Sequence, residues 1–351
     1  MKNVNYTLMG LRGLLALSVV IYHIYVSAVL EGYIPEIPKE NYLYLINYAG
    51  PISVNLFFVI SGYLITQSLL NKRTFGEFAV NRLLRIYPVF FAIHLIIFMV
   101  GPVIGYKWMD GIGAGEYLIQ FFSNALLLPG MFPLPIAQIV AWSLSYELFF
   151  YIIAGMFWLV SRNSKLPKAG KGLLYALMVA AVAVIIYYRK DFSFFAVGVA
   201  LYFGQNGIKK RWKPVKWFYF NGVILLAAIY ISYYVMAFPI AVALVLSFLL
   251  FIPVIMEYGF LSLFLRTGLM RYLGKISFSL YMWHTMVMFP LKIIVPRIGG
   301  FLGSNDLSFS IYALLSLGLS LLVSHVSYRY IEVKFTNVVK LRGLKKRAGS
   351  I

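Results

Sequence analysis

The sequence of 351 residues contains no cysteine, which excludes disulfide bonds, cysteine–zinc sites, iron–sulfur clusters and thiol catalysis. Charge is also scarce, because only 12% of the residues are charged, whereas soluble domains carry roughly 25%. Together with 62% hydrophobic residues and a mean hydropathy of +0.84, this composition excludes a soluble globular enzyme. The length is better divided into membrane spans of about 20 residues each.

Several catalytic motifs are missing as well. There is no Walker A sequence and no G-x-S-x-G motif, which excludes an NTPase and an α/β-hydrolase. The glycines at 111, 113 and 115 lack the spacing of a dinucleotide fingerprint and indicate a flexible loop. No pair of histidines or carboxylates has metal-ligand spacing, so we expect no metal site.

The hydrophobic runs predict an all-α membrane protein, a bundle of about ten transmembrane helices that forms a single membrane-embedded domain over residues 1–351. The predicted spans are 8–30, 51–70, 83–104, 138–160, 171–188, 191–207, 217–235, 238–257, 276–295 and 309–331. The first run has the length of a full span, so we predict a retained helix and not a cleaved signal peptide. The run 117–128 is too short to cross and predicts an interfacial or re-entrant helix.

The 31 basic residues, set against 11 acidic ones, follow the predicted loops in alternation. With the amino terminus in the cytoplasm, 25 of the 31 fall on the cytoplasmic side and six outside. This positive-inside pattern predicts that both termini are cytoplasmic and accounts for the net charge of +20 without nucleic acid. The basic tail 336–351 is expected to be a solvated or lipid-facing anchor.

The first predicted span carries Arg12 near its cytoplasmic end and His23 eleven residues later. Eleven residues make about three helical turns, so the two side chains share a face and lie about 16.5 Å apart. An anionic group can be held at one end of this stripe while a proton is removed at the other. We therefore interpret His23 as a catalytic candidate, because ionisable groups within a membrane are costly to bury.

Three other charged residues are candidates for the site. Arg82 and Arg85 begin the third span, share a helix face, and form with Arg12 a basic mouth suited to a phosphorylated donor. Their alternative interpretation is ordinary positive-inside anchoring. Glu147 is the one acidic residue in the middle of a predicted span. It either serves the site, pairs with a buried arginine, or is protonated and bonded to a serine or tyrosine.

An aromatic and hydroxyl-rich stretch predicts part of a substrate pocket. His284 lies in the segment 277–284 and is interpreted either as a pocket residue or as a packing residue. The proposed pocket consists of Trp142, Tyr146, Ser279, Tyr281 and His284. For His94 and His325 we predict packing roles.

These motifs together resemble the acyltransferase 3 family of integral-membrane acyltransferases, which act mostly on bacterial surface glycans. The matching segments, in order, are LRGLLALSVVIYHIY, NLFFVISGYLIT, RLLR with Ile86-Tyr87-Pro88, AWSLSYELFFY, ISFSLYMWH and Tyr330-Ile331-Glu332-Val333-Lys334-Phe335. They extend from residue 8 to about 335, so the resemblance covers nearly the whole chain.

The resemblance implies transfer of an acyl group, usually acetyl from cytoplasmic acetyl-CoA, to a hydroxyl of a polysaccharide, lipopolysaccharide or other glycan at the inner (plasma) membrane. His23 matches the family's essential histidine, and Arg12, Arg82 and Arg85 match its essential arginines. Glu147 stands where the family often has a glutamate after W-S-L. Many relatives carry a C-terminal SGNH-type domain, for which this sequence is too short. We therefore expect a stand-alone form that releases its product unaided or through a separate partner.

In the mechanism we expect, the three arginines hold the CoA phosphates at the cytoplasmic mouth and pantetheine extends up the bundle. His23 then acts as general base on the acceptor hydroxyl, or as an acyl-carrying nucleophile, with Glu147 orienting it. The alternative function is a transporter or flippase of a glycan or acyl substrate, which ten spans and buried charges also fit. A non-catalytic scaffold would leave the shared face of Arg12 and His23 without a reason. The acceptor stays open between O-antigen, capsule, lipid-linked oligosaccharide and a small glycoside.

Overall fold

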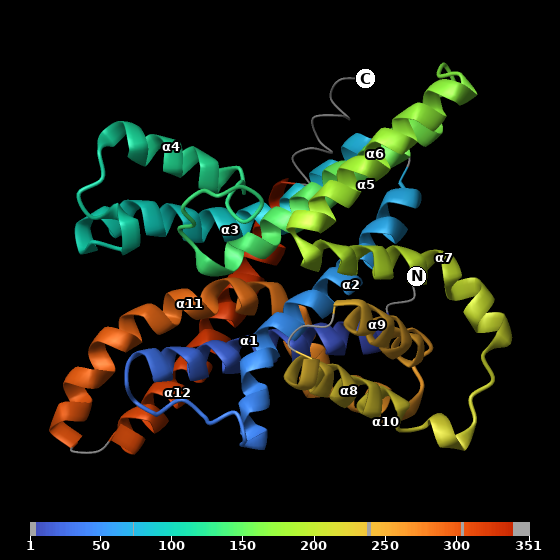
Figure 1. Cartoon of the computed structure of the whole chain (residues 1–351). Coiled ribbons are helices and arrows are strands. Elements are labelled where there is room, and N and C mark those ends of the chain that lie inside the picture. Colours follow the sequence, from blue (N-terminus) through green and yellow to red (C-terminus); the bar gives the residue numbers. More distant parts are fainter. Residues whose placement is uncertain (1–4, 73, 237–239, 303–304, 340–351) are drawn as a thin grey trace. The chain divides into compact units, whose positions relative to one another are not determined.

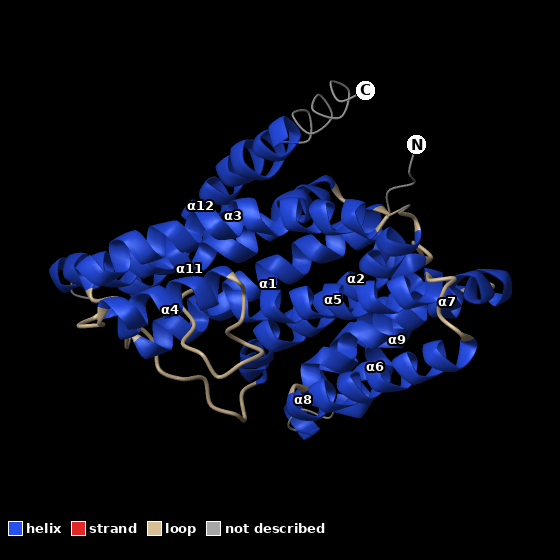
Figure 2. Ribbon diagram, turned by 90° about the horizontal axis from the view of Figure 1, so that it is seen from above, coloured by secondary structure: helices blue, strands red, loops and turns tan. Residues whose placement is uncertain are grey.

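The computed structural model describes residues 5–72, 74–236, 240–302 and 305–339. Within these ranges all regular structure is helical and no strand is present, in agreement with the predicted all-α class (Figures 1 and 2). The α-helices are α1 (Tyr6–Leu30), α2 (Ala49–Leu70), α3 (Phe75–Ile104), α4 (Ala114–Ala125), α5 (Trp142–Arg162), α6 (Lys168–Tyr188), α7 (Phe194–Arg211), α8 (Asn221–Met236), α9 (Ile240–Ile255), α10 (Gly259–Leu265), α11 (Gly268–Leu302) and α12 (Asn305–Ser327). The predicted cytoplasmic residues Lys2, Arg73 and the basic tail from 340 onward lie outside the described residues.

Each predicted span coincides with a helix, but the count of ten is not confirmed. In the described part of the chain, seven helical segments are long and apolar enough to cross a membrane. These segments are Tyr6–Leu30, Tyr42–Leu70, Phe75–Ile104, Ile139–Arg162, Lys168–Tyr188, Gly268–Arg297 and Asn305–Val339. An eighth results if α9 and α10, bent by 67° at their junction, form one span. The helix α8 has only 16 residues, and α7 carries three basic residues in its last turn.

The short apolar run that we predicted to be interfacial or re-entrant is a helix, α4, of 12 residues. Its first turn carries Glu116, and a helix of this length reaches about 18 Å. It is therefore too short to cross about 30 Å of hydrocarbon. The helical part of that prediction is confirmed, and the position at the membrane surface stays a prediction.

The chain comprises two compact units, each assembled from segments that are distant in sequence. The first unit contains Met1–Tyr22, Pro38–Ala79 and Tyr146–Gly274, and the second contains His23–Ile37, Val80–Ser145 and Lys275–Ile351. The helices α1, α3, α5 and α11 each begin in one unit and end in the other.

In the first unit, α2 and α7 approach closely because both carry glycine at the contact. A Cβ added at Gly198 of α7 would lie 2.1 Å from the carbonyl oxygen of Val59, and one added at Gly62 of α2 would lie 2.2 Å from that of Phe195. Small residues allow such backbone approach between helices in membranes. The helix α8 is tied to α2 by a buried hydrogen bond of 2.9 Å from Asn55 Nδ2 to Tyr233 Oη.

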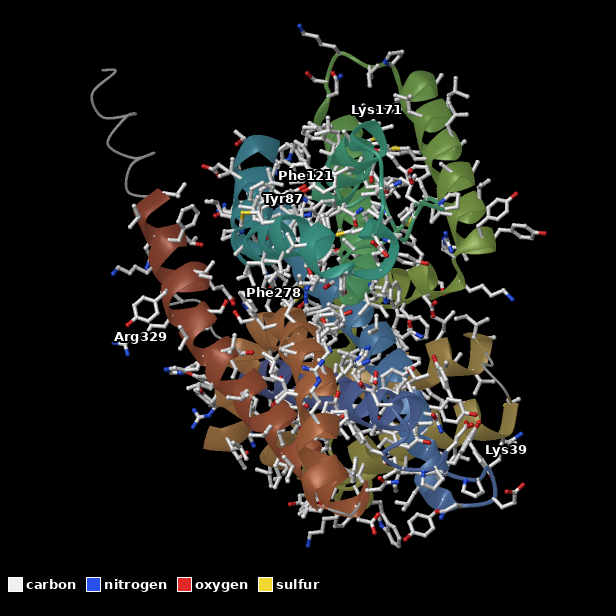
Figure 3. The ribbon with its side chains drawn as sticks, turned by 90° about the vertical axis from the view of Figure 1, so that its left-hand side faces the viewer. Lys39, Tyr87, Phe121, Lys171, Phe278 and Arg329 are labelled. Atoms are coloured by element: carbon white, nitrogen blue, oxygen red, sulfur yellow. The ribbon has the colours of Figure 1, made fainter. Side chains whose placement is uncertain are left out.

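In the second unit, the part of α1 that begins at His23 is tied to α12. The hydroxyl of Tyr312 donates to Ser27 Oγ at 2.8 Å, and both side chains are buried. His94 on α3 is also buried, with ring centroids 4.5 Å from Phe98 and 4.7 Å from Phe121 of α4 (Figure 3). The packing role predicted for His94 agrees with this aromatic cluster.

Candidate active site

His23 lies on α1, which runs without a break from Tyr6 to Leu30. The segment contains no proline, and in an apolar environment its backbone groups must pair internally, which favours a continuous helix. The unbroken helix places Arg12 and His23 on one face, about three turns apart. Both side chains are half-buried. The stripe deduced from the eleven-residue spacing is therefore compatible with the helix that forms.

The imidazole of His23 contacts a second histidine. His23 Nδ1 lies 3.3 Å from His284 Nε2, and the two ring centroids are 4.9 Å apart. His284 comes from the middle of α11 and is fully buried. Both residues belong to the second unit, so the contact is internal to one compact body. The structure thus joins two histidines that the sequence analysis had considered separately.

The hydrogen bonds of this pair fix the position of each ring proton. His284 Nδ1 lies 3.1 Å from the carbonyl oxygen of Leu280, which can only accept, so this nitrogen carries the hydrogen. In a neutral imidazole the other nitrogen is then an unprotonated acceptor. His284 Nε2 therefore accepts from His23 Nδ1, and the unprotonated nitrogen of neutral His23 is Nε2. A histidine held in this tautomer can take a proton at Nε2.

Polar side chains surround the same turn of α11. The hydroxyl of Tyr281 lies 2.8 Å from Ser143 Oγ and donates to the carbonyl of Val140 at 3.2 Å. Gln138 Nε2 donates to the carbonyl of Met282 at 2.8 Å. Because that carbonyl can only accept, the amide is oriented, and its Oε1 is buried with no donor among the described residues. The side chain of Gln138 therefore places a buried acceptor beside Met282, which lies two residues before His284 on α11.

The predicted pocket residue Ser279 faces a different set of partners. Ser279 Oγ lies 3.3 Å from Ser327 Oγ and 3.0 Å from Glu332 Oε2, and Trp283 Nε1 donates to Ser327 Oγ at 2.8 Å. Glu332 belongs to η6 (Tyr328–Phe335), a π-helical continuation of α12. Wide helical turns of this kind occur frequently at functional sites. Ser279 and His284 lie five residues apart on α11, about 1.4 turns, so they point in different directions.

Arg82 and Arg85 lie about two and about three turns after the start of α3. They are three residues apart on one helix, so they share a face, and both side chains are half-buried. Both belong to the second unit, which also contains the two histidines. The arrangement supports a paired guanidinium site, while the bound group stays a prediction.

Glu147 lies on α5 in the first unit. Its Oε1 accepts hydrogen bonds from Ser61 Oγ at 3.3 Å and from Tyr151 Oη at 2.5 Å. Its neighbour Tyr146 is buried and stacks on Phe58, with ring centroids 5.5 Å apart. His23 belongs to the second unit, so the proposed contact between Glu147 and His23 stays a prediction. Trp142, at the start of α5, is half-buried in the second unit.

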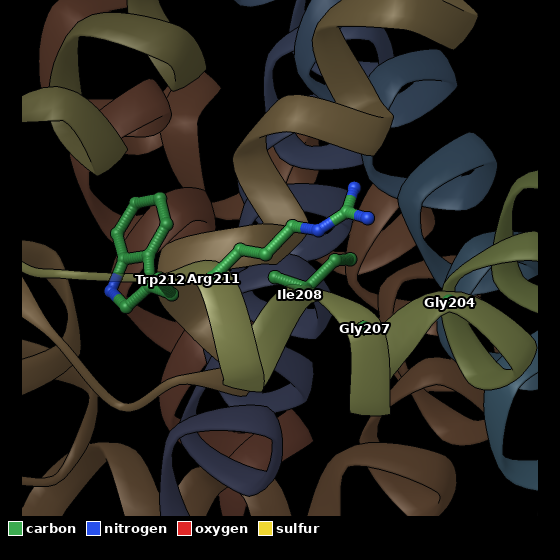
Figure 4. A pocket seen from close by; sticks show the side chains of 5 residues that line it. All are labelled: Gly204, Gly207, Ile208, Arg211 and Trp212. Atoms are coloured by element: carbon green, nitrogen blue, oxygen red, sulfur yellow. The ribbon is translucent and has the colours of Figure 1, made fainter.

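Among the described residues of the first unit, two cavities are lined by none of the predicted site residues. The larger, of about 660 Å³, is an apolar cavity between α2, α5, α6 and α7. The smaller, of about 370 Å³, lies along α7 and is lined by Gly204, Gly207, Ile208, Arg211 and Trp212 (Figure 4). Among the described residues, no group of three or more histidine, aspartate or glutamate side chains is arranged to hold a metal ion.

Several residues around the candidate site were not singled out from the sequence. Gln138, Ser61 and Tyr151 contact predicted site residues or their neighbours through side-chain hydrogen bonds. Tyr151 lies four residues after Glu147, a helical spacing at which side chains meet, so this partner was accessible to sequence reasoning. Ser61 and Gln138 had no such signal, because their partners are distant in the chain.

Comparison with known proteins gives a consistent result. A family model described as an acyltransferase domain matches residues 5–329. The acyltransferase MdmB of Streptomyces mycarofaciens is 27% identical over 193 residues, which cover 53% of this chain and 47% of that protein. The peptidoglycan O-acetyltransferase OatA of Listeria monocytogenes is 25% identical over a 373-residue alignment, covering 92% and 54%. An O-acetyl transferase of Shigella phage Sf6 is 27% identical over 142 residues, covering 36% and 40%.

The chain spans about half the length, or less, of these curated relatives. No solved structure matches it.

Proposed function

Because the chain belongs to the acyltransferase 3 family, we propose that it is a membrane O-acyltransferase whose catalytic base is His23. The observation that carries this proposal is the histidine pair, together with the family match over residues 5–329. The chain contains several helices that are apolar enough to cross a membrane, as an enzyme of this kind requires.

The proposed reaction transfers acetyl from cytoplasmic acetyl-CoA to a hydroxyl of a cell-surface glycan or glycolipid. Two of the reported relatives are named as O-acetyl transferases, and one of these is named for peptidoglycan, which supports both the acetyl group and a glycan acceptor. Membrane lipid surrounds the protein. Product delivery occurs either directly or through a separate partner.

In the chemical step, the hydroxyl oxygen of the acceptor attacks the thioester carbonyl carbon. The hydroxyl proton passes to Nε2 of His23, the carbon–sulfur bond breaks, and the proton is returned to the CoA thiolate. The products are an O-acetyl ester and free CoA, and His23 ends the cycle neutral. The alternative is attack by His23 itself, which would leave the acetyl group on the imidazole before transfer.

His284 supports this step by accepting the Nδ1 hydrogen of His23. That bond keeps the lone pair on Nε2 and restrains the rotation of the ring. A base must be both unprotonated at the correct atom and held within hydrogen-bond distance of its substrate. The hydrogen bond from His284 Nδ1 to the carbonyl oxygen of Leu280 in turn holds the His284 ring against the backbone of α11.

The remaining predicted residues bind the donor, orient His23 or shape the acceptor pocket. Arg12, Arg82 and Arg85 hold the phosphates of CoA, for which paired guanidinium groups are suited. Glu147 orients or charge-balances His23, and Trp142, Tyr146, Ser279 and Tyr281 shape the acceptor pocket. In this proposal the protein lies in the inner (plasma) membrane, crosses it ten times and has both termini in the cytoplasm.

The test is to incubate purified protein with radiolabelled acetyl-CoA and a lipid or glycan extract from its host. We expect label on the extract, and we expect Arg85→Ala to raise the KM for acetyl-CoA with a smaller effect on kcat. The control is His325→Gln. This histidine is exposed, in contrast to the packing role predicted from the sequence, so its replacement should retain normal transfer. Movement of label without release of CoA thiol would support a transporter instead.

A further inference from the structure

The apolar cavity of the first unit lies outside the proposed catalytic residues. It has a volume of about 660 Å³, within the range of small-molecule sites, and its walls are almost entirely aliphatic and aromatic side chains. The side chains Phe157 of α5 and Tyr175 of α6 stack with ring centroids 5.8 Å apart at one end of it. All of its lining residues belong to the first unit, so the cavity is a feature of one compact body.

One wall of the cavity is a helix that is otherwise open to its surroundings. Only 6% of the apolar window of α6 is buried, and the side chains of Leu177 and Val184 are more than half exposed. In a bilayer these residues face hydrocarbon, so a lipid chain can enter the cavity beside α6. The lining residues of α6 extend from Tyr175 to Ile186, about 16 Å along the helix. This length is close to half of the roughly 30 Å hydrocarbon thickness, which is the depth of one leaflet.

The end of the cavity at the α5–α6 connection is basic. Arg162 lies 4.7 Å above the ring of Trp158, and Lys171 Nζ donates to the carbonyl of Ser161 at 3.2 Å. Both Trp158 and Ser161 line the cavity, so these two cations are held at its mouth. The connection 162–171 also contains Lys165 and Lys168 and no acidic residue. This is a loop that the Lys/Arg pattern assigns to the cytoplasmic side.

A further group at the same end lacks a partner. The side chain of Trp158 is 8% exposed, and no acceptor for its indole Nε1 lies among the described residues. A buried donor without an acceptor is unfavourable. An oxygen-bearing group within reach of Nε1 would satisfy this donor.

From these observations we propose that the first unit binds an anionic phospholipid of the cytoplasmic leaflet. One acyl chain occupies the apolar cavity between α2, α5, α6 and α7, and the phosphate lies against Arg162 and Lys171, of which Lys171 is labelled in Figure 3. Both parts of such a lipid have a chemical counterpart in the first unit: the acyl chain fits the apolar cavity, which is about one leaflet deep, and the phosphate fits the cluster of cations at its end. Attraction of anionic lipids to such basic juxtamembrane segments is a general property of membrane proteins.

The test is native mass spectrometry and thermal unfolding of the detergent-purified full chain with phosphatidylglycerol or phosphatidylcholine. The wild type should bind phosphatidylglycerol at least tenfold more tightly than phosphatidylcholine, and added salt should reduce the difference. Equal binding of the two lipids would overturn the proposal. Glycerol phosphate alone should bind at least tenfold more weakly than the intact lipid, and equal binding would show that the cavity takes no chain.

Two kinds of variant test separately the contribution of the basic end and that of the apolar cavity to lipid binding. The double variant Arg162→Gln/Lys171→Gln should weaken phosphatidylglycerol binding at least tenfold, whereas Lys209→Gln/Lys210→Gln removes the same charge from exposed positions on α7 and should change it less than twofold.

Ala200→Trp or Ala196→Trp should fill the cavity and abolish binding, whereas Ala227→Trp, at an exposed position of α8, should not. Unchanged binding in the variants of the basic end or of the cavity would contradict the proposal. Displacement of the lipid by palmitoyl-CoA at equal concentration would also contradict it, since it would identify the cavity as a donor-chain site.

Discussion

At the scale of single residues, the account depends on where protons lie in the His23–His284 pair. A lone imidazole in an apolar helix can exchange its hydrogen between two nitrogens, and only one tautomer presents a lone pair to a substrate at Nε2. The acceptor-only carbonyl of Leu280 determines the tautomer of His284, and His284 in turn determines that of His23. In the proposed mechanism, the tautomer of His23 thus depends on a carbonyl oxygen 257 positions away in the chain.

Substitution of His284 should separate positioning from packing. His284→Leu removes the acceptor for His23 Nδ1 and should lower kcat by about 10²-fold, within the range attributed to general acid–base catalysis. His284→Gln retains an acceptor oxygen and should recover at least tenfold of that loss. The measurement is the pH dependence of kcat, in which the leucine variant should show a displaced acidic limb, because kcat falls at low pH as the base becomes protonated. A merely structural role predicts equal losses for both variants and an unchanged pH profile.

Tyr33, in the loop after α1, is expected to limit stability at high pH. Burial, followed by the charge of Glu31 and contact with Tyr312, raises the pKa of Tyr33 from 10.0 to about 12. The unfolded chain therefore loses the phenol proton first, so the stability contribution is complete below pH 10 and is lost as the pH rises towards 12. Tyr33→Phe should flatten this alkaline decline and leave stability at pH 7 unchanged or slightly higher.

The check is thermal unfolding in detergent from pH 8 to pH 12, with Tyr42→Phe at an exposed position as the matched control. The hydroxyl of Tyr33 is buried and has no partner among the described residues, so its removal leaves no hydrogen bond broken. A decline of equal steepness in Tyr33→Phe and the wild type would rule out this origin of the alkaline limit.

The sequence supplies only part of the candidate site at this scale. The spacing of Arg12 and His23 is sufficient to predict a shared face, because both lie on one helix with a fixed period. The contact of His23 with His284 joins residues 261 positions apart, and no local pattern encodes the packing of two distant helices. The same limit applies to Gln138, whose partner Met282 is 144 positions away.

At the scale of elements, two of the glycines of α7, Gly198 and Gly204, have different physical roles. Both lie in the short predicted span 191–207, yet α7 is continuous through them. Gly198 is in contact with the backbone of α2, whereas the nearest atom to a Cβ at Gly204 is Ile208 Cδ1 at 3.7 Å, an ordinary contact. Glycine is therefore required at the first position for packing and tolerated at the second.

Paired valine substitutions test this difference. Gly198→Val should destabilise the protein by about 1–3 kcal/mol, because the added side chain meets a backbone carbonyl that cannot move aside freely. Gly204→Val makes the same chemical change on the same helix and should be neutral or slightly stabilising, since valine has the higher helix propensity. The measurement is the thermal unfolding midpoint of both variants. Equal shifts would show that helix propensity, and not the contact with α2, governs this position.

Helix positions were predictable from the sequence, whereas helix continuity was not. The predicted span 238–257 ends at a sharp bend between α9 and α10, where Glu257 and Gly259 both adopt positive φ, 54° and 88°. Apolar composition continues through this point, so hydropathy does not reveal the bend. The bend depends on backbone conformations that a hydropathy average does not distinguish.

At the scale of the whole molecule, the sidedness of the proposed reaction depends on topology. Acetyl-CoA is cytoplasmic, so the arginines at the start of α3 must face that side for the proposed function to hold. The chain lacks cysteine, so single cysteines can be introduced for labelling without background. Ser164→Cys, in the α5–α6 connection, should be protected from an impermeant maleimide in intact cells, and Glu36→Cys should be labelled. The reverse pattern would invert the topology and place the basic mouth away from CoA.

The central claim is that His23 is the base for acyl transfer from CoA. Its most direct test is the initial rate of CoA thiol release from acetyl-CoA in the presence of the labelled acceptor fraction, compared for wild type and His23→Gln at equal amounts of folded protein. We predict that the variant loses activity by about 10²–10⁴-fold while its thermal unfolding midpoint stays unchanged. A His23→Gln protein that releases thiol and acylates the acceptor within twofold of the wild-type rate would contradict the account.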